Sequence, residues 1–104
     1  LEVPLVAFTG DTKASVFDRC PAEVLRAKVL ITECTFMGEE QTPAFARKRG
    51  HVHMDELAER ADLFKNEALL LAHFSQRYKN REIEAAMEAT LPNSLLKKAS
   101  FLPI

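Results

Sequence analysis

The sequence predicts an α/β protein built on a mainly parallel sheet. Apolar stretches of strand length alternate with stretches of helical spacing, in the order β-α-β-α-α-β-α-β. Strands that alternate with helices form parallel sheets, because each helix returns the chain to the starting end of the next strand. The 104 residues, 47% of them hydrophobic and 28% charged, fit one globular unit rather than a disordered chain.

Two strands and two helices are predicted in the first half of the chain. In order they are a strand over Val3–Phe8, a helix over Pro21–Ala27, a strand over Lys28–Phe36 and a helix over Pro43–Arg49. Pro21 suits a first helical position, since its missing N–H has no partner there. Thr42 is a start signal for the second helix and Gly50 is a stop signal.

The second half is predicted to add three helical segments and two strands. In order they are a helix with an apolar face from Met54 to Phe64, a strand over Glu67–Phe74, a helix from Asn80 to Leu91, a helical turn over Ser94–Lys98 and a strand over Ser100–Leu102. The run Glu67–Phe74 is so apolar that we expect it to be buried on both faces. Asn80 is the expected cap of its helix, and Pro92 ends that helix.

Composition narrows the class of protein. The 15 acidic and 14 basic residues give a net charge of −1, which argues against a domain whose main function is to bind polyanions. The longest apolar run, Ala68–Ala72, is too short to span a membrane, and no signal peptide is recognisable. Two cysteines form neither a disulfide framework nor a zinc knuckle, so we expect free thiols in a reducing intracellular compartment, the cytoplasm or an organelle. The chain opens with Leu1 rather than Met, and both a self-contained domain and a fragment of a longer protein remain open.

Chemically interesting side chains follow the predicted strands. Asp11 comes just after the first strand, Glu33 lies near the end of the second, and His73 ends the third. Because the carboxyl ends of parallel strands meet at one edge of a sheet, these residues are expected to converge there. The alternatives are that Asp11 only closes an Asx-type turn and that His73 is a hydrogen-bonded core residue.

Other candidate residues have both a functional and a structural interpretation. His51 and His53, followed by Asp55, have the spacing of zinc ligands, but they lie between a helix stop and a helix start and are interpreted as loop and cap residues. Ser75 and Arg77 could bind a phosphate, or Arg77 could pair with a helix acid. The basic run at 47–49 complements the dipole of its helix, and Cys34 is interpreted as a core residue.

Four short strings occur in one order along the chain. They are Phe8-Thr9-Gly10-Asp11-Thr12, Thr32-Glu33-Cys34-Thr35-Phe36, Gly50-His51 and His73-Phe74-Ser75-Gln76-Arg77-Tyr78. Together they resemble the C-terminal half of tRNase Z, the family of transfer-RNA 3′-processing endonucleases with the metallo-β-lactamase fold. The resemblance covers nearly the whole chain, and the last string is the most specific of the four.

The resemblance implies roles for the residues of these strings. In the family, two zinc ions activate a water that attacks a phosphodiester of precursor tRNA. By position, Asp11 resembles the carboxylate that bridges the two metals, and His73 resembles a ligand of one of them. Glu33 and His51 resemble a pair implicated in proton transfer to the leaving oxygen. The remaining residues implied, at the phosphate end of the pocket, are Ser75, Arg77 and Tyr78.

The resemblance also implies a fold and partners. This chain would be a single C-terminal half-domain over residues 1–104, one half of an αββα sandwich with helices on one face of its sheet. The family's main metal motif, His-x-His-x-Asp-His, belongs to the other half, so the chain alone is expected to be inactive and to need that N-terminal half in the same or a partner chain. Without it, an apolar sheet face would be open. A homodimer is expected of the complete protein.

The sequence departs from the family pattern at several positions. The family's His-Glu-Ala-Thr string has Thr32 and Cys34 in place of its His and Ala, and Val52-His53 replace the Ser-Thr that follows Gly-His. Ala72 stands where the family usually has Thr. Two alternatives therefore remain: a hydrolase of this fold that acts on another ester or phosphodiester, and a non-catalytic half-domain that pairs with a partner chain.

Overall fold

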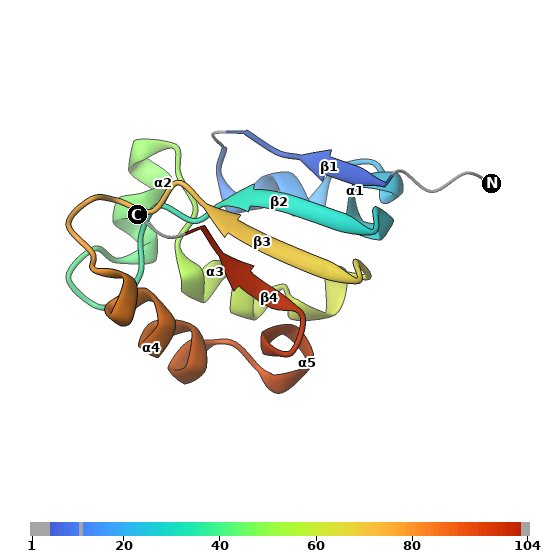
Figure 1. Ribbon diagram of the computed structural model, residues 1–104. Helices are drawn as coiled ribbons and strands as arrows, with labels where there is room; N and C mark the ends of the chain where they lie inside the picture. The colour runs from blue at the N-terminus through green and yellow to red at the C-terminus, as the bar shows by residue number, and fades with distance from the viewer. Residues whose placement is uncertain (1–4, 11, 103–104) are drawn as a thin grey trace.

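The computed structural model describes residues 5–10 and 12–102. Within them a four-stranded parallel sheet has the order β1-β2-β3-β4. The strands are β1 (Val6–Phe8), β2 (Val29–Glu33), β3 (Ala68–Ala72) and β4 (Ala99–Phe101). The α-helices are α1 (Ala22–Arg26), α2 (Pro43–Arg49), α3 (Met54–Glu59), α4 (Asn80–Thr90) and α5 (Asn93–Leu96). The α/β class and the parallel sheet are confirmed, and the sheet with helices gathered on one side is consistent with half of a metallo-β-lactamase-type domain (Figure 1).

Local signals place most of these elements correctly. The side chain of Thr42 accepts a hydrogen bond from the Phe45 N–H, and Gly50 ends α2 with a φ of 75°, as its stop signal predicts. The helical face that begins at Met54 is buried too, but α3 ends at Glu59 and a separate 3₁₀ turn, η2 (Ala61–Leu63), continues it. The predicted helix from Met54 to Phe64 is therefore two shorter segments.

Two predicted element ends differ from the structure, and one element was not predicted. Strand β2 ends at Glu33 rather than at Phe36, because the Thr35 N–H donates a hydrogen bond to the Glu33 carboxylate. The cap of α4 is Lys79, not Asn80, because Lys79 has the extended backbone and its N–H donates to the Glu82 side chain at 2.9 Å. The 3₁₀ helix η1 (Ala14–Asp18) was not predicted, although its two buried residues, Ala14 and Phe17, are three apart.

The core lies between the sheet and its helices. It contains Leu30, Leu69 and Leu71 from the central strands, and Cys34, predicted as a core residue, is fully buried there. Burial raises the pKa of the Cys34 thiol well above its usual range. Burying side chains of this size stabilises the fold by about 1.5–3 kcal/mol each.

The opposite face of the sheet is open in the part of the chain that the structure describes. Phe8 pairs in register with Ile31, and Ile31 pairs with Leu70, so these three side chains share a face. Phe8 is 68% exposed, and the other two are half-buried. The prediction that the third strand is buried on both faces was wrong, because the helices cover only one of them.

Candidate metal and proton-transfer site

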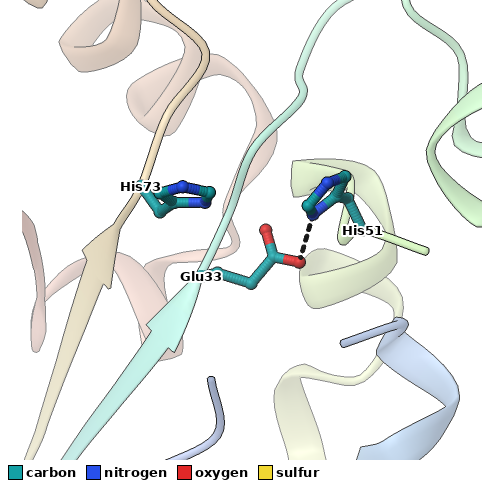
Figure 2. Close-up of side chains that lie close together, drawn as sticks. All are labelled: Glu33, His51 and His73. Atoms are coloured by element: carbon teal, nitrogen blue, oxygen red, sulfur yellow. Dashed lines mark hydrogen bonds and ion pairs between the residues drawn. The ribbon is translucent and has the colours of Figure 1, made fainter. Parts of the chain in front are cut away.

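Two strand ends bring the candidate site together. Glu33 ends β2 and pairs in register with Ala72, the last residue of β3, and His73 follows directly. His51 reaches the same place from the segment after α2. In Figure 2 the imidazoles of His51 and His73 lie on either side of the Glu33 carboxylate. The expected convergence of Glu33 and His73 at the carboxyl edge of the sheet is confirmed, while Asp11 lies outside the described residues.

Glu33 is buried and surrounded by donors. Its Oε1 accepts from the N–H groups of Thr12 and Val52 at 3.3 and 3.2 Å and lies 3.1 Å from the His51 Nδ1. Its Oε2 accepts from the Thr35 N–H at 3.1 Å and from the Thr35 hydroxyl. Only 2% of the residue is exposed, so these hydrogen bonds replace those that water would otherwise donate to the carboxylate.

The geometry after α2 fixes His51. The left-handed Gly50 turns the chain, and the His51 N–H then donates to the Ala46 carbonyl at 2.9 Å. The His51 ring packs edge-on against Phe36, with centroids 5.9 Å apart. With Glu33 as the acceptor, the imidazole carries its proton on Nδ1, which leaves Nε2 as the nitrogen free for other chemistry.

His73 has an unusual backbone. Its φ of 62° makes it the one non-glycine residue with positive φ within 5–10 and 12–102. Such a conformation costs on the order of 1–2 kcal/mol for a residue with a Cβ. Strain of this kind is found at sites where the surrounding structure holds a side chain in position.

Thr35 connects all three side chains, a role that the sequence analysis did not assign to it. Its hydroxyl donates to Glu33 and lies 3.4 Å from the His51 Nδ1 and 3.5 Å from the His73 Nδ1. Strand alternation was the available signal, because residues two apart, such as Glu33 and Thr35, fall on one face of an extended segment.

The three side chains could hold a metal ion. One ligand atom from each of Glu33, His51 and His73 lies within 4.8 Å of the others, and one carboxylate with two imidazoles is a donor set that zinc accepts. The hydrogen bonds favour a narrower assignment. Both Glu33 oxygens already accept hydrogen bonds, so ligation of a metal by Glu33 would have to displace donors.

The residues expected at the phosphate end lie just beyond His73. The Arg77 Nε donates to the Ser75 hydroxyl at 3.1 Å, and the guanidinium stands 5.9 Å from the Phe36 ring centre. The Tyr78 hydroxyl accepts from the Met37 N–H at 3.1 Å and lies within 3.0 and 2.8 Å of the Met37 carbonyl and the Gln41 Oε1. Burial raises the pKa of Tyr78. Its hydroxyl therefore holds the loop that follows β2.

His53 has the structural role predicted for it. It caps α3 by accepting from the Asp55 N–H at 3.0 Å, and its Nε2 lies 2.8 Å from the Gly38 carbonyl. One ring nitrogen thus accepts and the other donates, which describes a neutral imidazole with both nitrogens used. Fully buried, it is absent from the cluster of potential ligands.

A parallel α/β sheet with a carboxylate and two imidazoles at its carboxyl edge is consistent with half of a metallo-β-lactamase-type domain. Comparison with known proteins finds relatives that are named tRNase Z. The chain is 47% identical over 90 residues to tRNase Z TRZ1 of Arabidopsis thaliana and 44% identical over 85 residues to the chloroplastic tRNase Z TRZ2 of the same plant. The resemblance to tRNase Z is confirmed, and the chain is a homologue of these proteins.

The match covers most of this chain but a small part of each relative. It spans 86% and 81% of the chain, but 32% of TRZ1 and 24% of TRZ2, in their C-terminal part. No protein-family model matches the chain. None of the helices in the described ranges is long and apolar enough to cross a membrane.

Proposed function

We propose that this chain is the C-terminal part of a zinc-dependent endoribonuclease that removes 3′ trailers from precursor tRNA. The observation that carries the proposal is the Glu33–His51 pair beside His73, in a chain 47% identical to a tRNase Z. The relatives' names support the nuclease class and tRNA as the substrate. The geometry supports separate roles for the three side chains, with Glu33 and His51 in proton transfer and His73 in metal binding.

Glu33 and His51 form the proton-transfer pair of the proposal. A buried carboxylate beside the Nδ1 of His51 fixes the tautomer and the orientation of the ring. A proton on Nε2 can then pass to the leaving oxygen when the phosphodiester breaks. Glu33 acts through His51, so it is a positioning residue, while His51 is the group that touches the reacting atoms.

His73 and Asp11 are the proposed metal ligands. Zinc bound there would supply an activated water and charge stabilisation at the phosphate. A zinc site with two ions needs more ligands than two residues offer. We therefore propose that the N-terminal half of the protein supplies the others, and that this chain alone is inactive.

The open face of the sheet is the proposed contact with that missing half. Val6, Phe8, Ile31 and Leu70 offer apolar side chains that a second sheet would bury. The proposed assembly of the complete protein is a homodimer. The proposed location is a reducing compartment, and the chloroplast named for TRZ2 is one organelle of that kind.

Ser75, Arg77 and Tyr78 are proposed to shape the phosphate end of the pocket. The hydrogen bond from Arg77 to Ser75 aims the guanidinium, and a guanidinium can bind a phosphate through two N–H groups. Tyr78 contributes by holding the loop at Met37 and Gln41.

The test uses the protein in its natural full length. We expect it to cleave a precursor tRNA and to contain about two zinc ions per chain, as measured by gel assay and by elemental analysis. His51→Ala should lower turnover at least a hundredfold, within the range of general acid–base contributions, with unchanged zinc content. His73→Ala should lose both turnover and zinc. Glu33→Gln should also lower turnover, because Glu33 acts through His51, and Glu39→Gln, at an exposed glutamate, is its control.

Each result separates the proposal from an alternative. Loss of zinc in His51→Ala would make His51 a ligand, in line with the triad of Glu33, His51 and His73. Cleavage of a simple diester but not of precursor tRNA would favour a different hydrolase. If the full-length protein hydrolyses neither substrate, the results favour the alternative of a non-catalytic half-domain that pairs with a partner chain.

A further inference from the structure

The last turn of α2 carries an arginine that is held against an aromatic ring beside the candidate site. The guanidinium carbon of Arg49 lies 4.9 Å from the centre of the Phe45 ring. Phe45 packs edge-on against Phe36 at 5.2 Å, and Phe36 contacts His51 at 5.9 Å. A continuous set of ring contacts therefore links Arg49 to the proposed general acid.

Arg49 differs from its neighbour Arg47 in its charge environment. Arg47 pairs with Glu56 at 3.3 Å, and the Glu56 side chain is only 4% exposed, so the charge of Arg47 is largely compensated. Arg49 is exposed, and no carboxylate of the described ranges lies within 4.0 Å of it. Its positive charge is therefore available to a ligand.

The contact with Phe45 prepares Arg49 to bind a phosphate. A guanidinium stacked on a ring keeps its N–H groups at its edge, where they can form a bidentate contact with phosphate oxygens. Stacking also restricts the side chain before binding, so less conformational entropy is lost when the ligand arrives. Because the whole chain has a net charge of −1, any affinity for RNA from this region must come from local groups of this kind.

We propose that Phe45 and Arg49 form a subsite for a backbone phosphate of the RNA, next to the bond that is cut. The subsite rests on the proposed function, since it uses the RNA that the neighbouring site would cleave. The Arg77 guanidinium, over the Phe36 ring at 5.9 Å, belongs to the phosphate end already described. The guanidiniums of Arg49 and Arg77 would both bind the RNA backbone beside the ring pair of Phe36 and Phe45. His51 would face the scissile phosphate.

Fluorescence anisotropy with a labelled precursor tRNA tests the subsite in the full-length protein, with EDTA present so that the RNA stays intact. Arg49→Ala should weaken binding about five- to tenfold and lower the slope of log K against log salt by about one. Lys48→Ala removes a neighbouring exposed charge that has no ring contact, and it should change affinity less than twofold. Arg49→Lys keeps the charge and should recover only part of the loss.

Phe45→Leu tests the role of the ring. It should weaken binding to a similar extent as Arg49→Ala, and the double variant should be no weaker than Arg49→Ala, because both changes remove one contact. Circular dichroism checks that each variant is folded. With metal restored, the single-turnover cleavage rate of Arg49→Ala at subsaturating enzyme should fall in proportion to its loss of affinity.

Two failures are distinguishable. If the wild type binds precursor tRNA and Arg49→Ala binds as well as Lys48→Ala, the subsite is wrong and the proposed function stands. A fall in the saturated cleavage rate with unchanged affinity would also overturn the subsite, because Arg49 would then act through His51. If the wild type does not bind precursor tRNA at all, the proposed function fails, and the subsite fails with it.

Discussion

At the scale of single residues, the centre of the candidate site is a threonine rather than one of the ionisable groups. The Thr35 hydroxyl has one proton, which it donates to Glu33, and it stands within 3.4 and 3.5 Å of the Nδ1 atoms of His51 and His73. A hydroxyl in this position restricts both rings and supplies one of the hydrogen bonds to the buried carboxylate. Its removal should therefore disturb the site without changing its charge.

We predict that Thr35→Val lowers the cleavage rate of the full-length protein about tenfold or more, because a hydrogen bond to a charged group contributes about 1.5–3 kcal/mol. Thr35→Ser keeps the hydroxyl and should restore most of the rate. Single-turnover cleavage of precursor tRNA measures both variants, and urea unfolding reports whether valine only destabilises the fold. Equal rates for the valine variant and the wild type would contradict the role of Thr35.

At the scale of elements, the parallel register of β2 and β3 decides which residues meet. Because Glu33 pairs with Ala72, the residue after each strand end lies at the same edge, and His73 comes to within reach of the pair formed by Glu33 and His51. A shift of one residue would turn Glu33 to the other face of the sheet. The positive φ of His73 is part of this arrangement, since the chain turns immediately after β3.

The backbone at His73 gives a prediction that is independent of function. His73→Gly should be about 1 kcal/mol more stable than His73→Ala, since both remove the imidazole but only glycine adopts a φ of 62° without strain. Urea unfolding of the two variants, monitored by circular dichroism, measures the difference. Equal stability of the two would mean that the backbone relaxes at this position.

At the scale of the whole molecule, the two faces of the sheet differ. One face is closed by helices, and on the other Phe8 remains 68% exposed. Contacts between distant segments close the helical side. Among them, Arg60 at the end of α3 donates to both oxygens of Asp18 in η1, at 3.0 and 3.1 Å.

This ion pair predicts a pH dependence. The hydrogen bond from Arg60 lowers the pKa of Asp18 in the folded protein. A lowered pKa means that the contribution to stability is present above the unfolded value, near pH 4, and is lost as pH falls through the folded value. Asp18→Asn should therefore be slightly less stable than the wild type at pH 7, and the difference should shrink below about pH 4. Urea unfolding of both proteins across this range measures it, and a difference that stays constant down to the lowest pH would contradict the assignment to Asp18.

How far the sequence could predict the elements depended on how local their signals are. Thr42, Gly50 and the cap at His53 act on their own helix within a few residues, and each was placed correctly. The start of α4 was displaced by one residue, because asparagine is a common cap and the sequence does not show that Lys79 takes the extended conformation. Helix η1 was not predicted, because its five residues are too few for a helical periodicity to be recognised in the sequence.

The candidate site follows the same division. Parallel strand order was enough to predict that Glu33 and His73 meet, and the resemblance to tRNase Z added His51. Strand alternation places Thr35 on the same face as Glu33, but the sequence did not indicate that its hydroxyl lies between the two imidazoles, or that the Tyr78 hydroxyl contacts Met37 and Gln41. These contacts depend on the path of the loop after β2, which no local pattern encodes.

The sequence by itself determined the α/β class, the parallel order of the strands and the ancestry shared with tRNase Z. These follow from periodicity, helix signals and short strings, which are properties of neighbouring residues. Only the tertiary structure decided which face of β3 is covered and how the buried Glu33 is satisfied by donors from three separate segments. Burial and hydrogen-bond saturation depend on residues far apart in the chain, so they exist only once those segments have packed together.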